Sequence, residues 1–202
     1  MIRIGVIGGG AHSRSTHLPA LAAYATRHPA ELQLAAFCDL RPDVRDMAAR
    51  TYGFARCFDS VEALLAADAM DGCVAVTPVP VTAVIAGKVL AAGVWLLMEK
   101  PPGATVEEAT ALCALAGRMP ARAMVSMNRR FDPVVSAACV QMADQPPRYV
   151  RATLARVRRR EPTFVTDTGI HALDTLRKLA GDVRNFAVRT RTVEGTTWYG
   201  VD

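Results

Sequence analysis

Residues 1–17, MIRIGVIGGGAHSRSTH, decide the fold of this chain. Apolar residues dominate positions 2–7 and predict a buried strand, and Gly8–Gly10 then let the backbone turn sharply and come close to a ligand. We expect a helix from about Thr16. A strand, a glycine turn and a helix N-terminus form the geometry that cradles a pyrophosphate. The spacing Gly8-x-Gly10-x-x-Ser13 has serine at its third small position, so a glycine-rich turn without a ligand is the alternative.

The residues that follow, up to about Ser126, alternate apolar strands with helices. Strands are expected at 32–38, 55–57, 72–76, 94–98 and 123–126, and helices at 42–52, 60–67, 81–92 and 105–118. Proline and glycine mark the boundaries: His28-Pro29 ends the first helix and Gly53 ends the second. Because the strands are apolar on both faces, they predict a parallel sheet covered by helices on both sides, which is the α/β class.

Polar residues gather where these strands end. Asp39, Thr77-Pro78 and Glu99-Lys100 each follow an apolar strand directly. Because ligands of parallel sheets bind at the carboxyl ends of the strands, we expect these residues to line one site with the glycine turn. Asp39 could accept hydrogen bonds from a ribose diol, whereas a helix cap or a turn residue is the alternative. A carboxylate at Asp39 repels a 2′-phosphate and favours NAD, while Arg41 could pair with that phosphate and keeps NADP open.

The character of the sequence changes after Ser126. A polar junction at 127–133 precedes an expected helix at 134–142, an alternating strand at 148–158, a helix at 167–181 and a second alternating strand at 183–193. So few strands make a thin sheet with an open face or edge. We therefore expect a Rossmann-type parallel sheet domain at 1–126 and a second, incomplete α+β domain at 127–202.

Three side chains are candidates for chemistry. Lys100 would lie beside the nicotinamide of a bound dinucleotide and could donate a hydrogen bond to a substrate oxygen. Asp167 and His171 are spaced i, i+4, which places both on one face of a regular helix. His171 could take a hydroxyl proton, and Asp167 could orient it or bind a substrate hydroxyl. The alternative role of Lys100 is that of an ordinary surface lysine. Asp167 could instead cap the helix, and His171 could be a packed helix histidine.

The composition excludes several other classes. A net charge of +5 comes mostly from the arginines of 151–160, but no aromatic residues interleave them, which argues against nucleic-acid binding. The five cysteines are widely spaced without a Cys-x-x-Cys pair, so neither zinc nor a disulfide framework is implied, and no metal site is expected. His17 is interpreted as a residue that caps or packs the first helix. Neither a leader segment nor a membrane span is visible, and we expect a cytoplasmic protein.

Seven blocks of the sequence together resemble the Gfo/Idh/MocA oxidoreductases, the relatives of glucose–fructose oxidoreductase and inositol dehydrogenase. The blocks are Gly8-x-Gly10 with His17-Leu-Pro-Ala-Leu21, Cys38-Asp39, Val76-Thr77-Pro78, Leu90-Ala-Ala-Gly93, Met98-Glu99-Lys100-Pro101, Asn128-Arg-Arg-Phe-Asp-Pro133 and Asp167-x-Gly-x-His171-x-x-Asp174. Their order and spacing are specific, and they cover almost the whole chain.

The resemblance implies a dinucleotide-binding domain at 1–126, a domain for substrate and subunit contacts at 127–202, and NAD or NADP as cofactor. It implies hydride transfer at a hydroxyl-bearing carbon of a sugar or cyclitol, in a protein that forms homo-oligomers when full-length. By matching position, Lys100 and His171 would be catalytic and Asp167 would position the substrate. The cofactor would be lined by Gly8, Gly10, Ser13, Asp39, Arg41, Thr77, Pro78, Glu99 and Lys100.

Three departures from the family pattern stand out. The segment before His17 is about one residue longer than usual, and Thr82 stands where the family often has histidine. Members usually exceed 300 residues, whereas this chain has 202. A non-catalytic dinucleotide-binding or redox-sensing module is therefore the main alternative function. A methyltransferase is a weaker one, because it would give the Glu99-Lys100-Pro101 and Asp167–His171 blocks no role.

Overall fold

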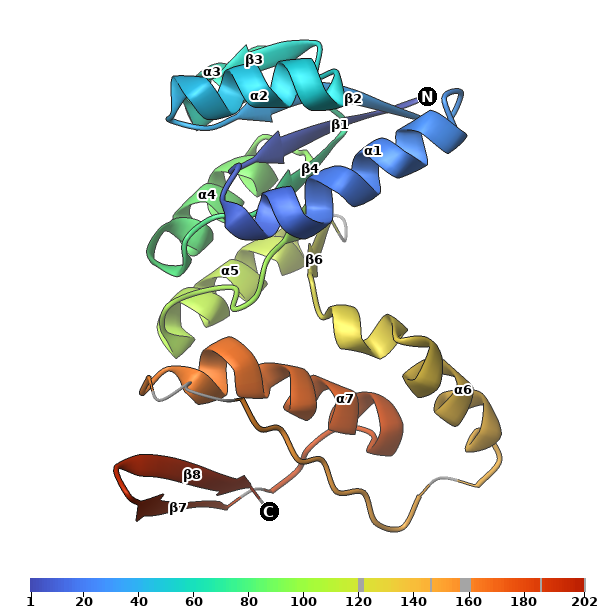
Figure 1. Ribbon diagram of the computed structural model, residues 1–202, viewed down its shortest axis with the longest axis vertical. Coiled ribbons are helices and arrows are strands. Elements are labelled where there is room, and N and C mark those ends of the chain that lie inside the picture. The colour runs from blue at the N-terminus through green and yellow to red at the C-terminus, as the bar shows by residue number, and fades with distance from the viewer. Residues whose placement is uncertain (120–121, 146, 157–160, 186, 202) are drawn as a thin grey trace. The chain divides into compact units, whose positions relative to one another are not determined.

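A six-stranded parallel sheet forms the centre of the first compact unit, Met1–Ser126, in the computed structural model (Figure 1). The structure describes residues 1–119, 122–145, 147–156, 161–185 and 187–201. The strands are β1 (Ile2–Ile7), β2 (Leu32–Cys38), β3 (Arg56–Phe58), β4 (Gly72–Ala75), β5 (Trp95–Met98) and β6 (Ala123–Val125). Their order in the sheet is β3-β2-β1-β4-β5-β6, so the chain reverses its direction of winding between β1 and β4. The expected α/β class with a Rossmann-type parallel sheet is confirmed.

Helices cover both faces of this sheet, as the doubly apolar strands predicted (Figure 1). They are α1 (Leu18–Arg27), α2 (Pro42–Tyr52), α3 (Val61–Ala66), α4 (Val79–Ala91) and α5 (Val106–Arg118). One buried cluster contains Val6 and Phe37 and packs against α1 and α2, while the other contains Ile7 and Cys38 and packs against α3, α4 and α5. Consecutive strand residues thus serve opposite faces of the sheet, as the twofold repeat of a strand requires.

Local signals place most helix ends, and the beginning of the first helix is the exception. Thr105 caps α5 by accepting a hydrogen bond from the Glu108 backbone N–H, and Gly53 ends α2 with φ of 72°. The helical backbone before α1 begins at Ala11 rather than near Thr16, and a π-helical turn, η1 (Ser13–His17), precedes α1. The expected beginning was wrong because the helix starts directly after the glycine turn.

The second compact unit, Met127–Asp202, holds two helices and a small antiparallel sheet. Its elements are η2 (Asn128–Phe131), α6 (Pro133–Gln141), the π-helical η3 (Val165–Gly169), α7 (Ile170–Ala180), β7 (Val188–Val193) and β8 (Thr196–Val201). The strand β8 was missed, although Glu194 and Gly195 form a two-residue hairpin turn with φ of 49° and 71°.

The strand expected at 148–158 is wrong where the structure describes it. Residues 148–156 form no strand, and Val157 and Arg158 lie outside the described residues. Alternating polarity produces a strand only where a neighbouring strand completes the hydrogen-bond ladder, and no described segment pairs with 148–156. The strand expected at 183–193 begins only at Val188. Within the described ranges, no helix is both long and apolar enough to cross a membrane.

Candidate functional site

A cleft of about 310 Å³ opens where β1, β4 and β5 end, at the point where the strand order reverses. Its lining residues are Gly10, Ala11, His12, Val76, Thr77, Pro78, Glu99 and Lys100. A larger cavity of about 390 Å³ lies in the second unit between 152–156, α7 and β8 and is lined mainly by apolar side chains. We place the candidate site in the smaller cleft because the strand ends, the glycine turn and the charged residues meet there.

Two glycines of the turn have different structural roles. Gly8 has φ of 94°, and a Cβ atom there would lie 2.2 Å from the Val76 carbonyl oxygen, so only glycine fits between β1 and β4. A Cβ atom on Gly10 would meet nothing within 4 Å. Gly8 therefore makes the turn possible, while Gly10 leaves the backbone open to a ligand in the cleft.

Ser13, the third position of the glycine motif, is fully buried at the beginning of η1. Its hydroxyl oxygen is buried without a hydrogen-bond partner in the structure. Ser13 is also absent from the cleft lining. It therefore occupies the position where a small residue allows close packing of helix and strand.

Asp39 lies directly after β2 and its carboxylate is tied to the glycine turn. It accepts hydrogen bonds from the backbone N–H of Gly9 at 2.8 Å and of Arg41 at 3.0 Å, and the Arg41 side chain pairs with it. Burial raises the pKa of Asp39, but the hydrogen bonds from Arg41 and Gly9 outweigh burial and lower this pKa. Arg41 stands at the N-cap position of α2, so Asp39 does not cap this helix.

Thr77 lines the cleft, and the buried Thr82 supports it. Thr82 is 2% exposed, and its hydroxyl lies 2.9 Å from the Thr77 hydroxyl and 3.1 Å from the Pro78 carbonyl oxygen. The residue that replaces the family's frequent histidine therefore holds the Thr77-Pro78 segment from behind. It does not line the cleft itself.

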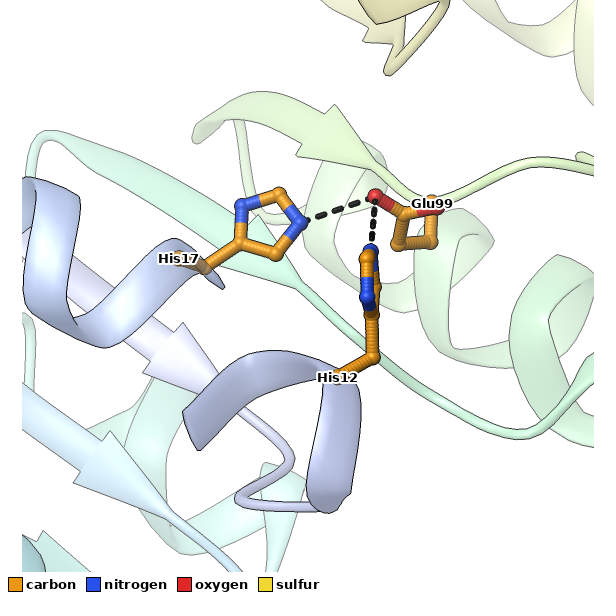
Figure 2. Close-up of side chains that lie close together, drawn as sticks. All are labelled: His12, His17 and Glu99. Carbon is orange, nitrogen blue, oxygen red and sulfur yellow. Dashed lines mark hydrogen bonds and ion pairs between the residues drawn. The ribbon is translucent and has the colours of Figure 1, made fainter. Parts of the chain in front are cut away.

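Glu99 is the centre of a side-chain cluster that the sequence reading missed (Figure 2). Its Oε1 atom lies 2.8 Å from His17 Nε2 and 3.3 Å from His12 Nε2. Burial raises the pKa of Glu99, but the hydrogen bond with His17 and the charges of both histidines lower this pKa to about 2. His17 stands at the N-cap position of α1 but makes no side-chain cap hydrogen bond, so the capping alternative was wrong. A five-residue spacing separates two side chains on a regular helix, so the sequence carried no signal for this cluster.

Asp167 and His171 lie in the second unit and both are half-buried. Asp167 belongs to η3 and His171 to the first turn of α7, so a π-helical turn interrupts the regular α-helix expected between them. Asp174, on the same helix, is buried and forms an ion pair with Arg130 of η2. Lys100 lies in the first unit, so its joint action with His171 stays a prediction.

Known proteins share the sequence pattern and the fold of this chain. Residues 2–127 match the protein family described as an oxidoreductase family with an NAD-binding Rossmann fold. A D-apiose dehydrogenase from Paraburkholderia graminis is 28% identical over an alignment of 201 residues, and the match covers 93% of this chain and 52% of the relative. An inositol 2-dehydrogenase from Rhizobium meliloti is 28% identical over an alignment of 194 residues, and the match covers 90% of this chain and 56% of that relative. The chain thus spans about half the length of the curated relatives it matches.

Solved structures show the same fold. The crystal structure of scyllo-inositol dehydrogenase from Lactobacillus casei, with bound NAD(H) and scyllo-inositol, superposes with a TM-score of 0.72. The two sequences are 20% identical, and the match covers 94% of this chain and 58% of that one. At this level of identity the likeness concerns the fold.

Proposed function

The chain belongs to the Gfo/Idh/MocA oxidoreductase family with its NAD-binding Rossmann fold, and from this premise we propose that it acts as an NAD(P)-dependent dehydrogenase on a sugar or cyclitol. The observation that supports this most is the cleft at the reversal of the strand order. There Gly10 leaves the backbone open, and Thr77-Pro78 and Lys100 come from two further strand ends. Residues 1–126 would bind the dinucleotide, and 127–202 would contribute to substrate binding and subunit contacts.

The proposed chemistry divides hydride and proton transfer between cofactor and protein. A bound NAD(P) would supply the acceptor for a hydride from a hydroxyl-bearing carbon. Lys100, which lines the cleft, would donate a hydrogen bond to the reacting oxygen and stabilise its negative charge. His171 would take the hydroxyl proton, and Asp167 would orient the substrate. The substrate class follows the relatives, which are named for D-apiose and inositol.

The residues around Asp39 favour NAD over NADP. The pKa of Asp39 is lowered by Arg41 and Gly9, so its carboxylate carries a negative charge at neutral pH. That charge would accept hydrogen bonds from a ribose diol and repel a 2′-phosphate. Arg41 is already engaged with Asp39 and with the Gly9 carbonyl oxygen, which leaves its guanidinium less available to a phosphate.

Nucleotide binding can be tested by titrating NADH and NADPH and following nicotinamide fluorescence. Gly10→Leu should fold, since an added Cβ atom meets nothing within 4 Å, and should weaken NADH binding at least tenfold because the side chain would occupy space in the cleft. Gly117→Ala, a helical glycine with equally open space, is the matched control and should bind as the parent does. Equal NADH affinity in Gly10→Leu and the control would overturn the assignment of the cleft.

Cofactor choice and turnover need separate variants. Asp39→Ala should weaken NADH binding about tenfold and strengthen NADPH binding, because it removes both the acceptor for the ribose diol and the repulsion of the 2′-phosphate. Lys100→Ala should abolish oxidation of D-apiose or inositols, while its affinity for NADH should change by less than tenfold. NADH binding without turnover of any sugar or cyclitol by the parent chain would indicate the non-catalytic module instead.

A further inference from the structure

We propose that His12, His17 and Glu99 form a binding site for a divalent transition-metal ion, best suited to Zn²⁺, at the edge of the cleft. His12 immediately precedes the π-helical turn η1, His17 is its last residue, and Glu99 follows β5. The three side chains converge on one point (Figure 2). The proposal concerns metal binding by this chain and does not depend on the proposed dehydrogenase activity.

The π-helical turn is what brings the two histidines together. In an α-helix each residue turns by about 100°, so two residues five positions apart point about 140° away from each other. In η1 the Leu18 backbone N–H instead donates to the Ser13 carbonyl oxygen, an i→i+5 bond that stacks residues five apart. The additional residue noted in the sequence before His17 is accommodated in this wider turn. Its consequence is that His12 and His17 share a face.

The spacing of the ligand atoms suits a small tetrahedral ion. Zinc–nitrogen and zinc–oxygen distances of about 2.0–2.1 Å place neighbouring ligand atoms about 3.3 Å apart. Glu99 Oε1 lies 3.3 Å from His12 Nε2 and 2.8 Å from His17 Nε2, and all three ligand atoms lie within 4.8 Å of one another. A shift of about half an ångström at His17 would open the tighter pair to that spacing. Two histidines and one glutamate are also a ligand set that zinc sites with an open position use.

The surroundings of the cluster leave room for a fourth ligand. Glu99 and His17 have side chains only 12% and 16% exposed, whereas the His12 side chain is 54% exposed. His12 and Glu99 also line the cleft, so water or a ligand oxygen from the cleft could complete the coordination. The other interpretation of the cluster is a hydrogen-bonded pair with an additional weak contact from His12. A metal site predicts that the affinity for the ion depends on His12, whereas a hydrogen-bonded pair predicts no such dependence.

The test is a titration of the untagged, metal-free chain with Zn²⁺ by calorimetry and with Co²⁺ by visible absorption. Because the thiol of Cys113 is exposed and could bind zinc by itself, all variants carry Cys113→Ser. We expect one Zn²⁺ per chain with micromolar or tighter affinity, and a Co²⁺ ligand-field band typical of four-coordination. His12→Ala, Glu99→Gln and His17→Ala should each weaken binding at least tenfold.

His28→Ala is the control, since His28 lies outside the cluster and pairs with Glu31. It should bind Zn²⁺ as the parent does. His17→Ala could fail to fold because His17 is largely buried, but His12 is exposed, so His12→Ala keeps the test decisive. Unchanged affinity in His12→Ala with a native circular dichroism spectrum, or the absence of stoichiometric binding by the parent, would overturn the metal site. Neither readout involves a nucleotide, so failure of the metal site can be distinguished from failure of the proposed function.

Discussion

At the scale of single residues, Gly8 is the position that tolerates a side chain least. Its φ of 94° is strained for any other residue, and an added Cβ would overlap the Val76 carbonyl oxygen at 2.2 Å. Gly8→Ala should therefore lower the free energy of unfolding by about 2 kcal/mol or more, measured by urea denaturation. Gly117→Ala in α5 should raise it by up to about 1 kcal/mol, because it replaces a helical glycine in open space. Similar urea concentrations at the midpoint of unfolding for both variants would contradict this account of the turn.

Asp39 makes stability depend on pH in a direction that its contacts determine. The folded-state pKa of Asp39 lies below its ordinary value, so its contribution is fully present above about pH 4 and is lost as pH falls through the folded-state pKa. Asp39→Asn should therefore be less stable than the parent at neutral pH, and the difference should shrink below about pH 4. Urea denaturation across that range measures it.

The control for this pH dependence is Asp59→Asn, which alters an exposed carboxylate at the end of β3. The free energy of unfolding of this variant should stay within about 0.5 kcal/mol of the parent value at every pH. If the difference in the free energy of unfolding between Asp39→Asn and the parent stayed constant down to low pH, the charge of Asp39 would not stabilise the fold.

At the scale of elements, one ion pair joins η2 to α7. Asp174 has a side chain only 7% exposed and accepts a hydrogen bond from Arg130 Nε at 3.0 Å and a second from the same guanidinium. Asp174→Asn should destabilise the second unit by about 1–3 kcal/mol, because it leaves a partly buried guanidinium without its charge partner. Asp182→Asn removes the exposed carboxylate that pairs with Arg177 and should cost less than about 0.5 kcal/mol. If the two variants lowered the melting temperature equally, burial of the Asp174 carboxylate would contribute nothing to the stability of the second unit.

The two π-helical turns, η1 and η3, occupy corresponding places in the two units. Each immediately precedes a regular helix and carries residues that the site proposals use: His17 in η1 and Asp167 in η3. A wider turn changes which residues share a helix face, so side chains that an α-helix would separate can meet. A spacing argument based on 3.6 residues per turn therefore misplaces residues five positions apart around η1. This is why His12 and His17 were not recognised as neighbours from the sequence.

At the scale of the whole molecule, the two units differ in how much apolar surface they bury. Both buried clusters lie in the first unit, whereas every residue of β7 is exposed and Trp198 of β8 is 57% exposed. A two-stranded sheet without a covered face is marginally stable. Amide hydrogen exchange should therefore be at least about 100-fold faster in β7 and β8 than in β1, β2 and β4. Comparable protection in both sheets would show that the hairpin is covered in solution.

The sequence alone predicted the fold of the first unit because its signals are local. The apolar strands, the Gly53 stop and the Thr105 cap each act within a few residues, and the structure places elements at those positions. The second unit was predicted less well. Residues 148–156 alternate like a strand, but a strand also needs a partner, and pairing is a property of segments distant in the sequence.

For the candidate site, the sequence determined which residues stand at the strand ends, because strand periodicity and turn chemistry are encoded in short stretches. Only the tertiary structure decided what these residues touch. Asp39 is joined to Gly9 and Arg41, Thr82 to Thr77, and Glu99 to both His12 and His17. Contacts such as that between His17 and Glu99 link side chains 82 positions apart. They depend on sheet order and on the wider helical turn, which together set the distances between the atoms.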